Sequence, residues 1–384
     1  MLLDRRCWFL IMESMRRSRR NPVLRSLVAA VALTASAANA DESVVISREL
    51  CNGLWIVPLT WASAKTGTSH ALTAVFDTGA SSLLIDPDGL ARASGQRIDE
   101  GQRVRMEGVS ASALKFSTFR PRVHEMSHLG AALGMDFDVF LPFPAFAGKL
   151  LVLDYPAREM RIEEGELPEP DGKTVFSARG RDDRPWLNVD LNGRERRILV
   201  DSGSNGRLEL KKLGRLEWLS DPVVSRVSTR MDKYVQRREG RIRNRITVAN
   251  LEFDQPLVSI TRDTELMGVH VLKHFVLTFD QANARVRFES KVEGPVRMRP
   301  RRGTGALLRA DPGGWFEVAR VLPDTPAAAT TLRAGDRVLE LDGTPVAERG
   351  CKRIDEPEKR RQRLGVQRGE RIEQLDLELI DLIE

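Results

Sequence analysis

The feature that most constrains the fold of this 384-residue chain is an internal repeat. An apolar run followed by Asp, a hydroxyl residue and Gly occurs as Ala74–Ser81 and again as Ile198–Asn205. Three further landmarks recur in the same order, at separations of 126 to 134 residues. A constant order of landmarks at a nearly constant period indicates two copies of one structural unit.

Each copy is rich in short runs of Val, Ile, Leu and Phe that are separated by Gly, Asp, Asn and Pro. This pattern is typical of β-strands joined by tight turns, so we expect a mainly β protein. The copies end in Glu163–Asp171 and Glu293–Gly303, which we interpret as linkers. The predicted segments are 1–40, 41–168, 169–295 and 296–384.

The positive charge of the chain is concentrated at its N-terminus. The net charge is +6, and the first 40 residues hold seven Arg and two acidic residues. Without them the net charge is about +1, so we expect no nucleic-acid partner. Five of these Arg lie between positions 16 and 25, shortly before the apolar run Leu27–Leu33, and Ala38–Ala40 matches the cleavage pattern of an export signal.

This signal predicts a periplasmic or secreted protein, with an uncleaved signal that anchors the chain in the inner membrane as the alternative. We expect no transmembrane helix beyond the signal segment. Cys51 and Cys351 remain after the signal, in a compartment that permits disulfides. Their spacing leaves pairing open, and we expect two separate buried thiols.

The repeat places Asp77 and Asp201 at the ends of two apolar strands. Two carboxyl groups a few ångströms apart cannot both ionise, so such a pair shares one proton. One carboxylate can then act as a base on water while the other carboxyl donates its proton to a carbonyl oxygen. The pattern therefore predicts a catalytic pair that needs no metal or organic cofactor.

Asp77–Ser81 and Asp201–Ser204 resemble the Asp-Thr/Ser-Gly signature of the pepsin and retropepsin superfamily, and the likeness covers about residues 50–290. It implies two pseudo-symmetric acid-protease lobes of the bacterial retropepsin-like type, with an aspartic endopeptidase activity on polypeptide substrates. The residue roles that it implies are a general acid and base (Asp77, Asp201), supporting hydroxyls (Thr78, Ser202), loop-shaping glycines (Gly79, Gly203) and a later glycine behind each loop (Gly134, Gly268).

One element of that family has no counterpart in the first copy. Pepsin-like enzymes cover the cleft with a hairpin flap that carries an aromatic residue, usually Tyr. Between Asp77 and Gly134 the aromatic residues are Phe116 and Phe119, with no Tyr or Trp. The flap is unassigned, and a non-catalytic peptide-binding scaffold remains an alternative function.

A competing motif is His124–His128, which matches the zinc-binding pattern His-Glu-x-x-His. The pattern binds zinc when both histidines project from one face of a helix. Pro121 and Gly130 disfavour a helix across the motif, and we interpret the histidines as surface or strand residues. A zinc metallopeptidase that uses His124, Glu125 and His128 is the second alternative.

Val318–Gly343 resembles a bacterial PDZ domain in its small-residue helix, its Gly-Asp turn and its strand ending in Asp-Gly. Gln367–Leu379 resembles the last strand pair of such a domain. PDZ domains bind extended peptides or C-termini by adding a strand to an open sheet edge. The resemblance places peptide binding at Gly303, Gly305, Ala306 and Leu307, with a C-terminal peptide as the implied ligand.

Overall fold

The computed structural model describes residues 43–62, 67–117, 119–180, 182–351 and 359–384. Strands hold 47% of the residues and helices 9%, so the prediction of a mainly β fold is confirmed. The predicted export signal, residues 1–40, lies outside the described residues. Within the described ranges, no helix has the length and apolar character that crossing a membrane requires.

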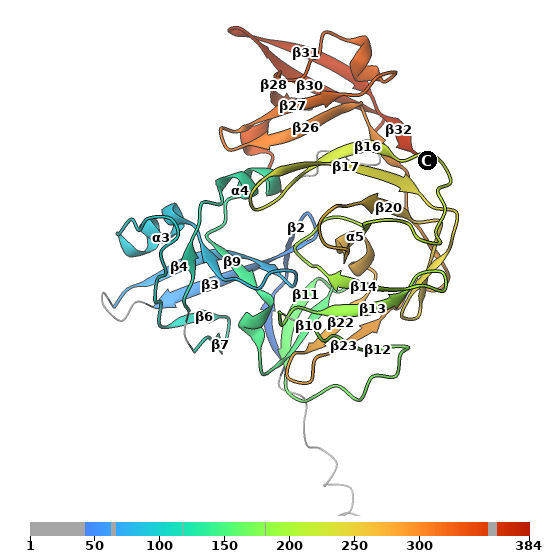
Figure 1. Cartoon of the computed structure of the whole chain (residues 1–384). Helices are drawn as coiled ribbons and strands as arrows, with labels where there is room; N and C mark the ends of the chain where they lie inside the picture. The colour runs from blue at the N-terminus through green and yellow to red at the C-terminus, as the bar shows by residue number, and fades with distance from the viewer. Residues whose placement is uncertain (1–42, 63–66, 118, 181, 352–358) are drawn as a thin grey trace, which may run out of the picture. The chain divides into compact units, whose positions relative to one another are not determined.

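The first copy of the repeat forms a sheet that we call sheet I, with the strand order β7-β6-β3-β4-β9-β5-β8 and with β2 paired to β3 (Figure 1). The last four residues of its strand β4 are all buried, because there β4 lies between β3 and β9. The elements of this copy are β2 (Glu49–Cys51), β3 (Leu54–Ala62), β4 (Ser69–Asp77), β5 (Leu84–Ile85), α3 (Pro87–Ser94), β6 (Val109–Ala111), β7 (Leu114–Lys115), β8 (Arg122–Val123), α4 (Ser127–Leu133), β9 (Val139–Pro142) and the 3-10 helix η2 (Phe143–Phe146).

The second copy forms sheet II, with the strand order β13-β14-β21-β15-β20-β17-β16. A three-stranded sheet, β18-β19-β24, also belongs to this part of the chain. The elements are β13 (Trp186–Asp190), β14 (Glu195–Val200), β15 (Leu208–Leu210), β16 (Val223–Thr229), β17 (Tyr234–Arg241), β18 (Ile246–Val248), β19 (Leu251–Asp254), β20 (Leu257–Ile260), β21 (Leu266–Met267), α5 (Val269–Leu272) and β24 (Val296–Arg297).

Sheets I and II share one pattern of strand pairing. Along β3-β4-β9-β5-β8 the successive pairs are antiparallel, parallel, antiparallel and parallel. Along β13-β14-β21-β15-β20 the pairs follow the same sequence of directions. Each Asp-Thr/Ser-Gly motif therefore leaves its sheet from the same position in the pattern, at the end of β4 or β14.

A third, six-stranded sheet contains strands of both copies in the order β1-β11-β10-β22-β23-β12. At its centre β10 and β22 pair antiparallel, with Val152 opposite Thr278. These two residues hold the third position in their strands, so the register relates the two copies by a local two-fold rotation. The strands are β1 (Val44–Ser47), β10 (Leu150–Asp154), β11 (Glu159–Glu163), β12 (Val175–Ser177), β22 (Val276–Asp280) and β23 (Arg285–Glu289).

The C-terminal residues form a separate sheet, which we call the terminal sheet, with the order β26-β27-β28-β30-β31 and with β29 on β28. Its own core cluster includes Phe316 and Val338, whereas Phe76, Val200 and Phe279 share one cluster that extends over sheet I, sheet II and the six-stranded sheet. The elements are β25 (Arg301–Gly303), β26 (Ala306–Asp311), β27 (Trp315–Val321), η3 (Pro326–Ala329), β28 (Arg337–Leu341), β29 (Thr344–Pro345), η4 (Val346–Glu348), β30 (Arg361–Arg368), β31 (Arg371–Glu378) and β32 (Ile380–Ile383).

The interpretation of Glu293–Gly303 as a linker is wrong, because this segment contains two paired strands. β24 pairs with β19, and β25 pairs with β32. The segment Glu163–Asp171 is also packed: Leu167 is buried, and its N–H donates to Oδ2 of Asp280 at 3.0 Å. An acidic, Pro-containing composition therefore does not identify segments without regular structure or packing in this chain.

Candidate active site

Asp77 and Asp201 lie at equivalent places, each at the carboxyl end of an inner strand. Asp77 ends β4, and Asp201 directly follows β14. In each sheet an antiparallel partner lies on one side of that strand and a parallel strand on the other, β9 beside β4 and β21 beside β14. The N–H of Asp201 also donates to the carbonyl of Met267 at 3.0 Å. Strand pairing on two sides holds both aspartates, whose side chains are largely buried.

The two turns that carry the aspartates are bonded to each other through their hydroxyl residues. The N–H of Thr78 donates to Oγ of Ser202 at 3.0 Å, and the N–H of Ser202 donates to Oγ1 of Thr78 at 2.8 Å. Oγ1 of Thr78 in turn donates to the carbonyl of Val200 at 2.7 Å. Both hydroxyl residues are fully buried, so these bonds fix the turns against each other without competition from water.

The glycines of the motif allow the turns to approach. A Cβ atom on Gly79 would lie 2.7 Å from Cγ of Asp201, and one on Gly203 would lie 2.1 Å from Cγ of Asp77. Both separations are far below ordinary carbon–carbon contact. Neither glycine has a positive φ, so the requirement for glycine here comes from space and not from backbone conformation.

The two carboxyl groups are close enough that each acts on the pKa of the other. Oδ1 of Asp77 also accepts the N–H of Gly79 at 2.5 Å and the N–H of Gly203 at 3.1 Å. Burial raises the pKa of Asp77, and these N–H bonds counteract the rise. Burial and the neighbouring Asp77 charge raise the pKa of Asp201 well above its ordinary value. The two N–H donors therefore favour the ionised form of Asp77, and Asp201 is the carboxyl group that holds a proton more readily.

Tyr155 and Arg184 belong to this neighbourhood, and the sequence analysis missed both. Tyr155 lies in the turn after β10, lines the cavity beside the aspartates and packs against Trp55 with ring centroids 5.2 Å apart. Burial raises the pKa of Tyr155, and the neighbouring carboxyl groups of Asp201 and Asp77 raise it further. Nη1 of Arg184 donates to the carbonyl of Gly79 at 2.9 Å, and its charge acts to lower the pKa of Asp77. The rarity of Tyr, with two in the chain, was a signal for the first of these residues.

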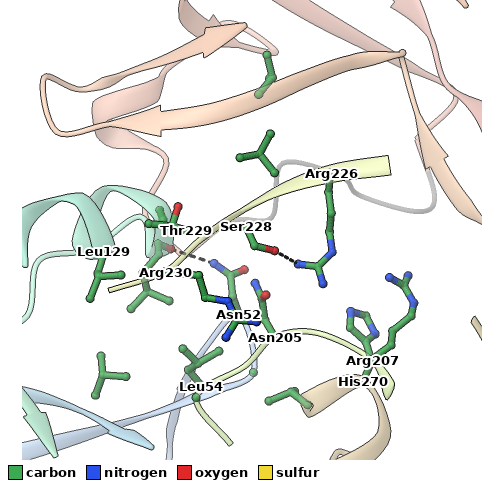
Figure 2. A pocket seen from close by; sticks show the side chains of 18 of the residues that line it. Asn52, Leu54, Leu129, Asn205, Arg207, Arg226, Ser228, Thr229, Arg230 and His270 are labelled. Carbon is green, nitrogen blue, oxygen red and sulfur yellow. Dashed lines mark hydrogen bonds between the residues drawn. The ribbon is translucent and has the colours of Figure 1, made fainter. Parts of the chain in front are cut away.

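A cavity of about 1070 Å³ opens from Asp77, and its lining also includes Gly79 and Gly203; Asp201 lies behind these residues and is not part of the lining. The hairpin β16–β17 crosses this space, and its residues from Ser225 to Lys233 line it (Figures 1 and 2). The tip of the hairpin is held at α4, where Nε2 of His128 lies 3.2 and 3.1 Å from the carbonyl oxygens of Arg230 and Met231. The cavity is therefore covered by a hairpin of the second copy, whereas the sequence analysis expected a flap in the first copy.

The glycine predicted behind each loop is present in one copy only. Gly268 follows β21, and a Cβ atom there would lie 2.7 Å from the carbonyl oxygen of Gly206, in the loop after Asp201. Gly134 instead ends α4 with a φ of 88°. Strand register shows that Pro142 lies opposite Asp77 in the first copy. The assignment of Gly134 to the catalytic loop is wrong, because the matching position lies eight residues further along the chain.

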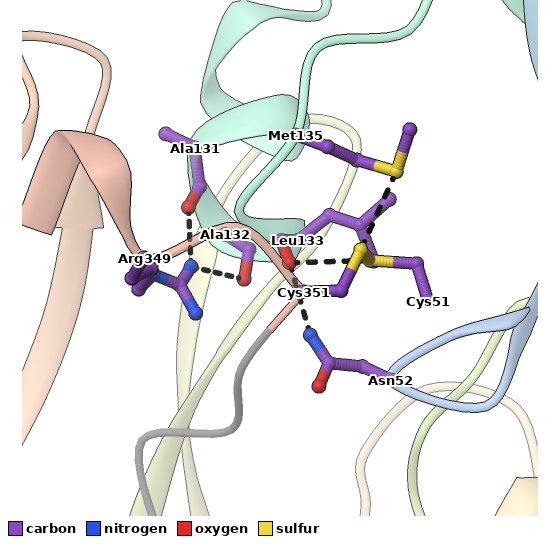
Figure 3. The surroundings of a disulfide bond; sticks show 8 residues. All are labelled: Cys51, Asn52, Ala131, Ala132, Leu133, Met135, Arg349 and Cys351. Atoms are coloured by element: carbon purple, nitrogen blue, oxygen red, sulfur yellow. Dashed lines mark hydrogen bonds between the residues drawn. A yellow bond between two sulfur atoms is a disulfide. The ribbon is translucent and has the colours of Figure 1, made fainter.

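Gly134 lies against the C-terminal part of the chain, next to a disulfide bond. A Cβ atom on Gly134 would lie 2.0 Å from the carbonyl oxygen of Gly350. Beside it, Cys51 and Cys351 form a disulfide, so the prediction of separate thiols is wrong (Figure 3). Nη2 of Arg349 donates to the carbonyls of Ala131 and Ala132 at 2.7 and 3.0 Å. Three hundred residues separate the two cysteines, and folding brings them together at the end of α4.

The zinc alternative is contradicted by the backbone of its motif. Helix α4 begins at Ser127, so His124 and Glu125 precede it while His128 lies within it. Nδ1 of His124 pairs with Glu100 at 2.9 Å, and His128 is bonded to the β16–β17 hairpin. The described residues include no cluster of metal-binding side chains. The two histidines therefore do not share the helix face that the zinc mechanism requires.

The residues predicted for peptide binding lie at the start of the terminal sheet. Gly303 ends β25, Gly305 has a φ of 90°, and Ala306 and Leu307 begin β26. Of these, Gly303, Ala306 and Leu307 line the cavity that contains Asp77. The structure thus brings residues of this predicted peptide site and of the aspartate pair to one cavity.

Comparison with protein-family models finds no match, and a search of curated proteins finds no significantly similar sequence.

Proposed function

We propose that this protein is an aspartic endopeptidase in which Asp77 and Asp201 activate water to hydrolyse peptide bonds. The observation that carries the proposal is the close approach of two buried carboxyl groups beside a large cavity. Oδ1 of Asp77, which lines the cavity, accepts the N–H of Gly203 in the turn that carries Asp201, and each carboxyl group acts on the pKa of the other. A buried like-charged pair is costly for folding, and its usual use in proteins is acid–base chemistry. The turns that hold the pair match each other bond for bond at Thr78 and Ser202, which supports one joint role.

The asymmetry of the pair assigns the roles. Asp77, stabilised as a carboxylate by two N–H donors, takes a proton from the attacking water. Asp201 donates its proton to the carbonyl oxygen of the scissile bond, which gives a tetrahedral diol. Collapse of the diol breaks the C–N bond: the leaving nitrogen takes the proton from Asp77, and a diol hydroxyl gives its proton to Asp201 as the carbonyl re-forms. Asp77 is then again the carboxylate, and Asp201 is again the carboxylic acid.

The architecture proposed for this activity is two acid-protease lobes followed by a PDZ-like domain. The identical sequence of strand pairings in sheets I and II supports the lobes, as does the two-fold register of β10 and β22. The strand order of the terminal sheet supports the PDZ-like domain. β26 is the end strand of that sheet, and its residues Ala306, Leu307 and Leu308 line the cavity. A substrate tail paired with β26 would be delivered toward the aspartates.

The proposed place of action is the periplasm or the exterior, with exported or envelope proteins as substrates. The disulfide between Cys51 and Cys351 supports this, because such bonds persist in oxidising compartments.

A cleavage assay tests the proposal. The full chain is incubated with a denatured protein from pH 3 to pH 8, in parallel with Asp77→Asn, Asp201→Asn and the exposed control Asp88→Asn. Loss of either catalytic group should lower kcat/KM by a factor of at least about 10²–10⁴, and the control should not change it. A metal chelator should have no effect. Cleavage that survives both substitutions would refute the dyad, and absence of cleavage by the folded wild type would favour a non-catalytic peptide-binding scaffold.

A further inference from the structure

A cluster of charged side chains lies in sheet II beside the cavity. We call it the arginine cluster; its members are Arg207, Arg226, Arg230, Arg237, Glu209 and Glu239. Both carboxylates are buried, so neither charge is compensated by bulk water. The cluster is also close to the catalytic pair, because the charge of Arg230 acts on Asp201.

Glu239 organises one half of the cluster. Its carboxylate accepts hydrogen bonds from Nη1 of Arg207 at 3.2 Å, Nε of Arg226 at 3.1 Å and Oγ of Ser259 at 2.8 Å, and from the hydroxyl of Ser225. The pKa of Glu239 lies well below its ordinary value, because the two guanidinium groups outweigh the effect of burial. The carboxylate is ionised and holds both arginines in fixed positions.

Glu209 organises the other half. Its carboxylate is 3.2 Å from Nη2 of Arg230 and 3.2 Å from Nη2 of Arg237, and 3.7 Å from Nη2 of Arg226. Glu209 comes from β15, between β20 and β21, whereas Arg226 comes from β16 at the edge of sheet II.

The arginines of the cluster face the cavity and the carboxylates do not. Arg207, Arg226 and Arg230 line the cavity, whereas Glu209 and Glu239 do not contribute to its lining. Figure 2 shows the three arginines around the same space, with Arg226 bonded to Ser228 at 2.7 Å. A ligand in the cavity therefore meets guanidinium groups whose conformations are set before it arrives.

The cluster carries more positive than negative charge. Four guanidinium groups against two carboxylates leave a net charge of +2 within it. Nε of Arg207 and Nη2 of Arg226 are buried and have no hydrogen-bond acceptor among the described residues. Over the whole cavity, nine Lys or Arg and three Asp of the described residues line the space. Excess charge of this kind is unfavourable in a folded protein unless an anion binds to it.

The opposite wall of the cavity is apolar. It consists of side chains from sheet I and from the segment around α4, namely Leu54, Leu129, Leu133, Phe137 and Phe140. Asp77 ends β4 of sheet I, which contributes to the apolar wall. Asp201 directly follows β14 of sheet II, which contains the arginine cluster. A chain that passes the catalytic pair therefore meets an apolar environment on one side and a cationic environment on the other.

We propose that the substrate is a polypeptide with an apolar side chain on the sheet I side of the cleaved bond and an Asp or Glu side chain on the sheet II side, bound by Arg207, Arg226 and Arg230. Cleavage of this substrate rests on the proposed peptidase function. The preference in binding rests on the cavity alone. Arginine presents paired donors that match a carboxylate, which favours an acidic side chain over a neutral one of equal size.

Matched peptides test this preference. Fluorescent decapeptides contain one Phe and, at each of the three positions before and after it in turn, Glu, Gln or Lys. Binding to full-length Asp201→Asn is measured by fluorescence anisotropy, and kcat/KM is measured with the wild type. At one or more positions on a single side of Phe, the Glu peptide should bind about tenfold more tightly than the Gln peptide, and the Lys peptide more weakly than both. Equal affinities for Glu, Gln and Lys at every position would overturn the inference.

Variants locate the preference. Arg230→Gln should reduce the Glu-over-Gln ratio severalfold, whereas Arg245→Gln, an exposed arginine outside the cavity lining, should leave it unchanged. Arg230 is the least buried cavity-facing arginine of the cluster and so the one whose loss disturbs the fold least. An unchanged ratio in Arg230→Gln, with a normal unfolding transition, would also overturn the assignment. The wild-type peptide series decides the matter if this variant fails to fold.

The two readouts separate the two proposals. Discrimination in binding without cleavage by the wild type would refute the peptidase function and support carboxylate recognition. Cleavage without discrimination in either binding or kcat/KM would support the peptidase function and refute the recognition of acidic substrates.

Discussion

Asp77 and Asp201 come from nearly identical motifs, yet their hydrogen bonds differ. Asp77 accepts two backbone N–H groups, whereas no backbone N–H of the described residues donates to the carboxyl group of Asp201. This difference, together with the Asp77 charge, favours protonation of Asp201 over protonation of Asp77. At the scale of single residues, the electrostatics of the pair thus depend on departures from symmetry that the repeated sequence does not reveal.

The raised pKa of Asp201 has a consequence for stability. The folded protein binds this proton more tightly than the unfolded chain, whose Asp pKa is about 3.9. The contribution is complete below that pKa and is lost as the pH rises through the folded pKa. Asp201→Asn should therefore raise Tm at pH 7 and change it little at pH 3.5. Thermal unfolding at both pH values checks this, and an equal shift at the two would contradict it.

The close contact at Gly203 predicts a strong effect of one methyl group. In Gly203→Ala the new Cβ atom would collide with Cγ of Asp77, so that the carboxyl group must move from its position. We expect a loss of about 1–3 kcal/mol in the free energy of unfolding and a loss of cleavage of at least about 100-fold. Urea unfolding and kcat/KM measure the two effects. Ser81→Ala, at an exposed site four residues beyond Asp77, is the control and should change neither; wild-type kinetics in Gly203→Ala would show that the contact is not needed.

At the scale of elements, the roles of β16, β17 and α4 are not evident from their sequences. β16 and β17 form the hairpin over the cavity and carry Arg226, Arg237 and Glu239, which a reader of the sequence meets as scattered charges on β-strands. Their pairing into one network depends on the register of β15, β17 and β20 in sheet II. The alternation of buried and exposed residues along a strand can be predicted from the local sequence. The identity of the neighbouring strand cannot.

The network makes Glu239 important for stability. Glu239→Gln leaves Arg207 buried without its counter-charge and leaves Arg226 with only the more distant Glu209, so the free energy of unfolding at pH 7 should fall by about 3–5 kcal/mol. The pKa of Glu239 is depressed in the folded protein, so its contribution is present above the unfolded pKa of about 4.3 and is lost as the pH falls through the folded value. Urea unfolding measures the loss.

An exposed ion pair supplies the comparison. Glu252→Gln removes one of the two acidic partners of Arg245 at the protein surface, the other being Asp254, and should cost less than about 1 kcal/mol. Similar losses for the two variants would show that the buried network contributes no more than a surface pair.

At the scale of the whole chain, the terminal sheet is joined to the first copy of the repeat by a disulfide and by the bonds of Arg349 to α4. Loss of the link in Cys51→Ser should lower the free energy of unfolding by about 2–5 kcal/mol. Because the bonds of Arg349 remain, β26 and α4 should exchange amide hydrogens faster without separating. Hydrogen exchange with and without a reductant measures this, and the reductant should have no further effect on the variant. Unchanged exchange at β26 and α4 would show that the link does not restrain these elements.

The sequence by itself determined the elements that depend on local pattern: the mainly β character, the repeat, and the two strands that end in Asp-Thr/Ser-Gly. These follow from hydrophobic alternation and from the steric demands of a tight turn, which act over a few residues. Only the tertiary structure decided the pairing of Cys51 with Cys351, the true counterpart of Gly268, the covering hairpin and the arginine cluster. Each of these joins residues that are distant in sequence, and strand register and chain packing alone decide which of them meet.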